Sequence, residues 1–401
     1  SATSTYDYKL VVSQKVHNYL NNLIDFSKHG KYNVIFAKFI IKPTLLTGMK
    51  IRLMTLFAAA FAIIGCSTDN KGSSATIEGE ISLQASKSYI KCDGTDAVEL
   101  KVIVTDKNGN QQDVTSSSEI YMNGDDTKMD SNLFSTDKEG EYEFYAFYGL
   151  KMAQNITVAA LQNVPEIPAD SQEGSTAFKH RILLIQHTGN ECPNCPRMMT
   201  VLKSLREDPA YNGLYSHVAS HSYNDTDAAY SDAAKSVSST FCSGFYPEAT
   251  LNLTKTYQLG TDLSEIKTAI DELKKNPASA SAAVAVEALG NKIFVEAEVK
   301  AGTENNFRVA AWLLEDDIYA RQAGATESWF NYHENCLRAM YGTTPNNQIY
   351  GEKIGTLKSG DKVQCTFTFT AEDHWKVENC KVLIIVTEHT EDGNYDVAST
   401  A

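Results

Sequence analysis

The stretch "HTGNECPNCPRMM" (residues 187–199) places two cysteines, Cys192 and Cys195, three positions apart. It follows "HRILLIQ" (180–186), an apolar run typical of a strand buried on both faces. After the cysteines, apolar residues recur at helical spacing over residues 198–205. The pair therefore lies between a strand and a helix, and three roles are open for it: a redox centre, half of a metal site, or a structural disulfide.

The next 80 residues predict further alternation of strands and helices. "LYSHVAS" (214–220) indicates a second strand, and residues 225–241 indicate a helix. "GFYPEATLNLT" (244–254) indicates a proline turn leading into a strand in which Leu251 and Leu253 alternate. Residues 263–273 have the apolar spacing of an amphipathic helix, with Thr261 or Asp262 as its N-cap.

This order of elements resembles the thioredoxin fold, with the cysteine pair where that fold carries it. The resemblance implies that Cys192 attacks, that Cys195 resolves, and that Pro247 is the cis-proline of the later turn. A helix N-terminus supplies partial positive charge, which favours a thiolate at its first cysteine. The spacing of three lets the second sulfur resolve a mixed disulfide within the same site.

The other roles of the pair remain open on the sequence. A zinc site needs a second pair of Cys or His ligands, and only scattered histidines lie nearby: His187, His217 and His221. A structural disulfide without turnover needs nothing more than Cys192 and Cys195. Glu191 carries a carboxylate next to Cys192, which disfavours the thiolate that exchange requires. Cys242, five residues before Pro247, is either a third thiol near the pair or a buried apolar side chain.

Strand-like segments flank this region on both sides. Residues 75–162 contain short strands with period-two alternation and a hairpin turn at Asn108–Gly109, and residues 162–175 read as a proline-containing linker. From residue 279 the strand pattern returns, with a turn at Gly290–Asn291 and a long insertion over residues 316–358. Within that insertion, His333 and Arg338 are candidates for a binding surface or for a packed loop with an ion pair.

The predicted fold class is therefore multidomain α/β plus all-β. A thioredoxin-like α/β domain (174–277) is flanked by two immunoglobulin-like β-sandwich domains, at 75–162 and 279–401.

The segment that starts at Met49 has the pattern of a secretory signal. Lys50 and Arg52 precede a short apolar run that is too short to span a bilayer, and Gly65 stands directly before Cys66. This pattern resembles the lipobox of bacterial lipoproteins, which implies a signal peptide at 49–65, acylation of Cys66 and a polar tether at 66–74. Residues 1–48 are then expected to be a non-native or upstream-translated extension.

The charge of the chain excludes nucleic acid as a partner. The formal net charge is −14, and the residues after Gly65 hold 28 Lys and Arg against 48 Asp and Glu, which gives −20. A body this acidic is repelled by a phosphate backbone. Of the eight cysteines, seven remain beside the lipidated Cys66, so at least one thiol is free or pairs with another molecule.

Several motifs together resemble one family. The lipobox at Cys66, "TGNECPNCP" (188–196), "WLLEDDI" (312–318) and "CLRAM" (336–340) are similar to the Bacteroidetes family of outer-membrane lipoproteins named after a 28-kilodalton outer-membrane protein. The resemblance covers roughly residues 174–397 and implies an outer-membrane location, facing the periplasm or the cell surface.

Two functions follow as hypotheses. The first is a lipid-anchored binding or structural protein with a protein partner at the cell envelope. The alternative is a membrane-tethered thiol–disulfide oxidoreductase that uses Cys192 and Cys195. Neither hypothesis requires a metal or another cofactor.

Overall fold

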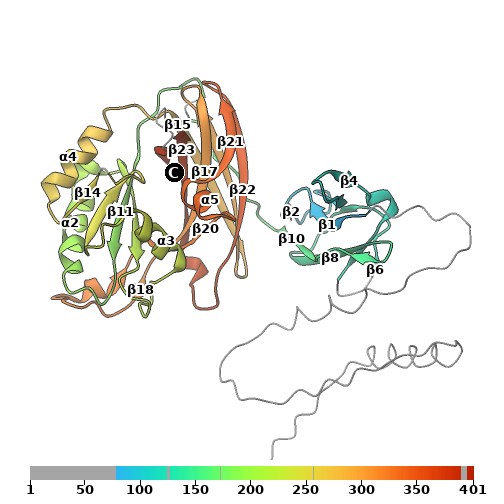
Figure 1. Ribbon diagram of the computed structural model, residues 1–401, viewed down its shortest axis with the longest axis horizontal. Helices are drawn as coiled ribbons and strands as arrows, with labels where there is room; N and C mark the ends of the chain where they lie inside the picture. Colours follow the sequence, from blue (N-terminus) through green and yellow to red (C-terminus); the bar gives the residue numbers. More distant parts are fainter. Residues whose placement is uncertain (1–77, 124–126, 172, 256, 390–394) are drawn as a thin grey trace, which may run out of the picture. The chain divides into compact units, whose positions relative to one another are not determined.

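The computed structural model describes residues 78–123, 127–171, 173–255, 257–389 and 395–401 (Figure 1). The predicted extension, the signal peptide, Cys66 and the tether lie outside these residues and stay predictions. The described part is rich in strands and combines all-β regions with a region of mixed strands and helices, so the coarse fold class is confirmed.

Residues 80–161 form two sheets packed face to face. One sheet contains β1 (Glu80–Ala85), β3 (Val98–Thr105), β4 (Gln111–Asp113) and β7 (Leu133–Phe134). The other contains β2 (Tyr89–Lys91), β10 (Ile156–Leu161), β8 (Gly140–Tyr148), β5 (Glu119–Met122), β6 (Thr127–Lys128) and β9 (Lys151–Met152). A short 3₁₀ turn, η1 (Thr115–Ser117), follows β4.

Period-two alternation explains the core of this sandwich. Val98, Leu100 and Val102 on β3 are fully buried against residues of β8 and β10. The predicted turn after β3 is present, with Gly109 at a positive φ of 84° between β3 and β4.

A nine-stranded sheet runs through the rest of the chain. Its order is β14, β13, β11, β12, β20, β17, β23, β24, with β21 on one edge of β17. The strands are β11 (Ile182–Thr188), β12 (Tyr215–His221), β13 (Glu248–Leu251), β14 (Gln258–Leu259), β17 (Asn305–Glu315), β20 (Cys336–Met340), β21 (Glu352–Leu357), β23 (Cys380–His389) and β24 (Tyr395–Thr400).

This sheet contains strands from both sides of residue 278, where the sequence predicted a domain boundary. Strand β20 pairs with β12 through Ala219 and Cys336, so strands from both predicted domains share hydrogen bonds. The regions 174–277 and 279–401 therefore do not have separate sheets. The pairing joins residues more than a hundred positions apart, which local periodicity cannot reveal.

Helices cover both faces of the first half of this sheet. They are α2 (Cys195–Glu207), α3 (Asp232–Phe241) and α4 (Leu263–Leu273), with a 3₁₀ turn η2 (Pro209–Tyr211) after α2. Every residue of β11 is buried, as the apolar run predicted. Ile182 and Leu184 pack with α2 and α4, whereas Leu183 and Ile185 pack with α3 on the opposite face (Figure 1).

The helix caps explain where two helices begin. The Asp262 side chain accepts hydrogen bonds from the amides of Ser264 and Glu265, so Asp262 is the N-cap of α4. Helix α3 begins at Asp232, later than the predicted residue 225, because Ser231 caps it by accepting from the Ala234 amide.

The predicted strand after Pro247 is shorter than its pattern suggested. Strand β13 ends at Leu251, and Asn252 and Leu253 have positive φ angles of 49° and 54°. The prediction that Leu253 continues the strand is therefore wrong, because the backbone enters the left-handed region there.

A three-stranded sheet packs against the β17 end of the large sheet. It contains β15 (Ala280–Leu289), β16 (Lys292–Ala301) and β22 (Lys362–Thr370), and the predicted hairpin turn at Gly290 joins the first two. Its apolar side chains share one core with β17 and β23. A 3₁₀ turn, η4 (Val377–Asn379), precedes β23.

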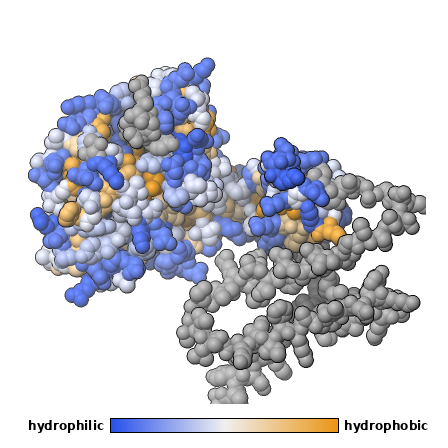
Figure 2. Space-filling model, viewed as in Figure 1, coloured by the Kyte–Doolittle hydropathy of each residue, from blue (hydrophilic) through white to orange (hydrophobic). Residues whose placement is uncertain are grey.

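The insertion after residue 316 is regular structure and not a long loop. It contains β18 (Ile318–Tyr319), η3 (Ser328–Asn331), β19 (Tyr332–His333), β20, α5 (Pro345–Tyr350) and β21. Two of its strands join the large sheet, and the segment between β18 and β19 lies against the cysteine loop. On the face drawn in Figure 2, hydrophilic residues predominate and apolar ones are scattered.

Candidate functional site

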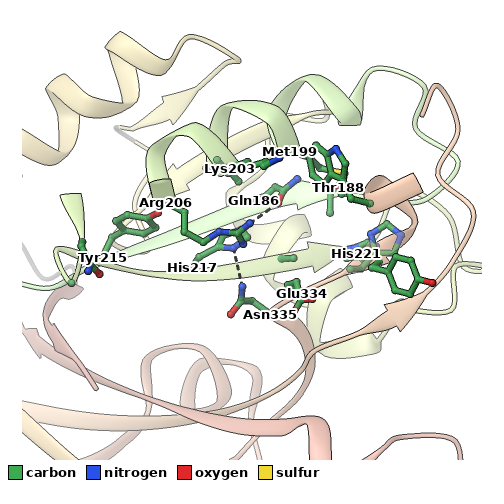
Figure 3. A pocket seen from close by; sticks show the side chains of 17 residues that line it. Gln186, Thr188, Met199, Lys203, Arg206, Tyr215, His217, His221, Glu334 and Asn335 are labelled. Atoms are coloured by element: carbon green, nitrogen blue, oxygen red, sulfur yellow. Dashed lines mark hydrogen bonds between the residues drawn. The ribbon is translucent and has the colours of Figure 1, made fainter. Parts of the chain in front are cut away.

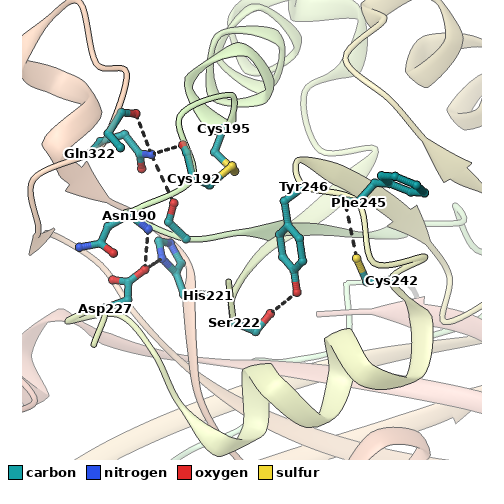
Figure 4. Close-up of a disulfide and its surroundings, with 12 residues drawn as sticks. Asn190, Cys192, Cys195, His221, Ser222, Asp227, Cys242, Phe245, Tyr246 and Gln322 are labelled. Atoms are coloured by element: carbon teal, nitrogen blue, oxygen red, sulfur yellow. Dashed lines mark hydrogen bonds and ion pairs between the residues drawn. A yellow bond between two sulfur atoms is a disulfide. The ribbon is translucent and has the colours of Figure 1, made fainter. Parts of the chain in front are cut away.

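The two cysteines of the central motif are joined at the end of a buried strand. Cys192 and Cys195 form a disulfide with a Cα–Cα distance of 5.4 Å (Figure 4). Cys195 is the first residue of α2, and Pro196 follows it in the first turn, where a missing N–H costs little. The exposed fractions of Cys192 and Cys195 are 1% and 0%, so neither side chain is open to solvent.

A segment of the insertion, residues 320–325, packs against the loop that carries the disulfide; we call it the cover segment. The Gln322 side-chain amide donates hydrogen bonds to the carbonyl oxygens of Cys192 at 2.9 Å and Gly189 at 3.3 Å. The Ala323 amide donates to the Asn190 carbonyl oxygen at 2.6 Å (Figure 4 shows this region). The cover segment thus binds the backbone on the approach to Cys192.

A glycine allows the cover segment to approach so closely. Gly324 has a φ of +72°, and a Cβ there would lie 2.3 Å from the carbonyl oxygen of Pro193. A side chain would therefore both strain the backbone and push the segment away from the disulfide loop. Sequence reasoning missed Gln322 and Gly324, because nothing local marks a contact with a motif more than a hundred residues away.

Pro247 lies at the same end of the sheet as the disulfide. The Tyr246–Pro247 peptide bond is cis, as the sequence suggested. Strand β13 starts at the next residue and pairs with β11 so that Glu248 faces His187, five residues before Cys192. The Tyr246 hydroxyl is hydrogen-bonded to the Ser222 hydroxyl at 3.0 Å (Figure 4).

A buried hydrogen bond between His221 and Asp227 lies next to the residues in front of the cysteines. Asp227 accepts hydrogen bonds from His221 Nδ1 and from the backbone amide of Asn190, both at 2.7 Å. Burial raises the pKa of Asp227, but the hydrogen bonds that it accepts and its electrostatic interaction with His221 outweigh burial and bring the pKa to about 2. Asp227 was not predicted, since a lone aspartate in a turn carries no distinguishing signal.

Two further histidines, His187 and His333, are hydrogen-bonded within the fold. His187 is hydrogen-bonded to the hydroxyls of Ser238 at 2.8 Å and Thr250 at 3.0 Å, and burial lowers its pKa to about 4. His333 is hydrogen-bonded to the carbonyl oxygen of Ala320 at 3.1 Å. Within the described residues, no group of three or more His, Cys, Asp or Glu side chains is arranged to hold a metal ion.

Two further predicted candidates are Arg338, which is buried, and Cys242, which is half-buried. Arg338 Nε forms a buried ion pair with Glu315 at 2.7 Å and also bonds the Ala228 carbonyl oxygen, which matches the packed-loop interpretation. The sulfur of Cys242 lies 3.6 Å from the carbonyl oxygen of Phe245, within its own turn, and its thiol is free.

Comparison with known proteins concerns mainly the C-terminal part. Residues 234–401 match the family model described as "Outer membrane protein Omp28", which leaves Cys192 and Cys195 outside the matched range. No curated protein sequence matches the chain. No helix in the described ranges has the length and apolar character needed to cross a bilayer.

Solved structures give distant similarities. HBP35 of Porphyromonas gingivalis is similar with 14% identity and a TM-score of 0.46, over 56% of this chain and 75% of that one. The sporulation control protein Spo0M from Bacillus subtilis is similar with 15% identity and a TM-score of 0.19, over 30% of this chain and 48% of that one. The family match confirms the resemblance found in the sequence and indicates association with the outer membrane. Over residues 234–401, the chain is therefore similar to the Omp28 family of outer membrane proteins.

Proposed function

We propose that this protein is an outer-membrane lipoprotein, anchored through acyl chains on Cys66, that binds a protein partner at the cell envelope. In this proposal residues 174–277 form a thioredoxin-like core, and the Cys192–Cys195 disulfide stabilises that core without turnover. The order β11, cysteine pair, α2, β12, α3, Pro247, β13 and α4 supports the thioredoxin-like assignment. The family match over residues 234–401 supports the location.

The observation that carries the structural role is the burial of the disulfide, whose loop is hydrogen-bonded to the cover segment. Thiol–disulfide exchange requires a thiolate to reach a sulfur atom, so its rate depends on access. Cys192 is 1% exposed, and Gln322 holds the backbone of Cys192 by a hydrogen bond of 2.9 Å. A disulfide in this position resists exchange with a protein substrate unless the cover segment moves.

The test compares the full-length protein with Cys192→Ser. Under native conditions, the wild-type disulfide should resist dithiothreitol, as followed by thiol alkylation and mass spectrometry, and insulin reduction should not exceed that of the variant. Chemical cross-linking in cells should give the same cross-linked species for both proteins. Catalysed insulin reduction that disappears in Cys192→Ser would overturn the structural role.

The lipid anchor has a test of its own. Labelling cells with an alkyne-tagged fatty acid should modify the wild-type protein and should fail for Cys66→Ser. Cys92→Ser is the matched control, because Cys92 is a free, partly buried thiol of the first sandwich and should leave labelling unchanged. Equal labelling of the wild type and Cys66→Ser would contradict the proposed acylation of Cys66.

A second candidate function is a membrane-tethered thiol–disulfide oxidoreductase, favoured by the disulfide at the N-terminus of α2. The Cys192 thiolate would attack a substrate disulfide and release one substrate thiolate. The Cys195 thiolate would then attack the Cys192 sulfur and release the second, so two electrons pass to the substrate and the protein disulfide forms. In cells, this candidate predicts mixed disulfides that accumulate in Cys195→Ser and disappear in Cys192→Ser.

A further inference from the structure

A cavity of about 280 Å³ lies beside α2 (Figure 3). Its walls come from α2, from β11 and β12, and from η3 and β19 of the insertion. The volume corresponds to roughly nine water molecules at about 30 Å³ each, which suits a ligand of about ten non-hydrogen atoms. The cavity joins two parts of the chain that the sequence assigned to different domains.

Two cations from α2 line this cavity. Lys203 and Arg206 are three residues apart, so they lie on the same face of the helix and repel each other. Neither side chain has a carboxylate within 4.0 Å among the described residues. Lys203 Nζ lies 4.8 Å from the centre of the Trp329 ring, which fixes it at the cavity wall. An anion between the two cations would relieve their repulsion.

The only carboxylate among the residues that line the described cavity is Glu334. Burial and the nearby Asp316 carboxylate raise the pKa of Glu334, which favours its neutral form. Asp316 itself is paired with Lys381 Nζ at 2.6 Å. The residues that line the cavity therefore carry a net positive charge.

The floor of the cavity is neutral and hydrogen-bonded. His217 lies between the side chains of Gln186 and Asn335, each 3.2 Å from one ring nitrogen (Figure 3). Asn335 Nδ2 donates to Nδ1, so the proton is on Nε2 and is donated to Gln186 Oε1. Burial lowers the pKa of His217 to about 3, which keeps the ring neutral.

We propose that this cavity binds a small organic monocarboxylate, with its carboxylate between Lys203 and Arg206 and its apolar body against Met199, Leu202 and Tyr332. The guanidinium of Arg206 matches a carboxylate in a bidentate geometry, and the ammonium of Lys203 adds a second charge. This ligand site goes beyond the proposed binding of a protein partner, and it depends neither on the redox state of the disulfide nor on the lipid anchor.

The test uses benzoate as the probe and benzamide as its neutral match of equal size, with full-length protein at low salt. Isothermal titration and saturation-transfer NMR should detect benzoate binding with a Kd of about 1 mM or tighter. Benzamide should bind at least about tenfold more weakly, since it lacks the charge that Lys203 and Arg206 recognise.

Variants of one helix separate the site from a general charge effect. Arg206→Gln and Lys203→Gln should each weaken benzoate binding about tenfold, whereas Arg206→Lys should retain part of it. Arg197→Gln removes an exposed cation from the same helix, outside the cavity, and should leave the affinity unchanged. Circular dichroism of each variant checks that the fold is kept.

Four results would overturn the proposal. Three are no benzoate binding at millimolar concentration, equal binding of benzoate and benzamide, and an equal loss of affinity in Arg197→Gln. The fourth is displacement of benzoate by inorganic phosphate at equal concentration, because the cavity would then be a site for simple anions.

Discussion

The side-chain amide of Gln322 donates a hydrogen bond to the carbonyl oxygen of Cys192 at 2.9 Å, across 130 residues of sequence. This contact ties the insertion to the loop that carries the disulfide. Because Cys192 is almost fully buried, the chemistry of the pair depends on how firmly the cover segment is held.

Replacing Gln322 by alanine should make the disulfide easier to reduce. The change removes the hydrogen bonds to Cys192 and Gly189, and a loss of about 1–2 kcal/mol would raise the open population about tenfold. The measurement is the initial rate of dithiothreitol reduction, followed by alkylation. Gln348→Ala removes a comparable bond, to the Gly342 carbonyl oxygen, between residues outside the cover segment and the disulfide loop, and should leave the rate unchanged. Equal rates for both variants would contradict the covering role.

Gly324→Ala should destabilise the protein more than Gly213→Ala. Both glycines have a φ of +72°, so the backbone cost of about 1–2 kcal/mol is common to both. At Gly324 the new Cβ would also lie 2.3 Å from the Pro193 carbonyl oxygen, whereas at Gly213 it meets nothing within 4 Å. The overpacking should add about 1–3 kcal/mol, measured by urea unfolding. Equal losses would mean that the cover segment moves away without cost.

Removing the disulfide should cost a modest free energy of unfolding. The closed loop is very short, so the entropic contribution in Cys192→Ser/Cys195→Ser is about 2 kcal/mol. Denaturant titration of the oxidised wild type and the double variant measures the difference. Cys242→Ser, at a free thiol, serves as control and should change the free energy by no more than about 0.5 kcal/mol. A double variant as stable as the wild type would leave the disulfide without a structural role.

The free energy of unfolding should fall between pH 6.5 and pH 4, in part because of His187. Its pKa is lowered from 6.5 to about 4 in the folded state. The unfolded chain therefore binds more protons in this window, so stability present above it is lost as the pH decreases. In His187→Gln the slope should be smaller by up to about 1.4 kcal/mol per pH unit.

His374→Gln is the control for the pH dependence. It replaces an exposed histidine by the same residue type, glutamine, so the comparison isolates the effect of burial at His187. An unchanged slope in His187→Gln would show that the buried ring does not resist protonation.

The sequence predicted most of the local structure. The apolar run ahead of Cys192, the helix that begins at Cys195, the Asp262 cap and the turn at Gly290 all depend on neighbours within a few positions. Backbone hydrogen bonds and alternation act over that range, so periodicity is enough to find them. The cis peptide before Pro247 was also expected, from resemblance to a fold and not from periodicity.

The tertiary structure decided how those elements meet. Strand β20 joins β12 through Cys336 and Ala219, so a single sheet runs through two predicted domains. The insertion places Gln322 on the disulfide loop and contributes Trp329 to the wall of a cavity lined by Lys203. These contacts link residues that are more than a hundred positions apart. Burial of apolar side chains and strand pairing across the whole fold stabilise them. A local sequence pattern therefore cannot predict them. The sequence by itself determined the elements and the chemistry available at Cys192 and Cys195; only the tertiary structure decided that the pair is buried and that a charged cavity lies beside α2.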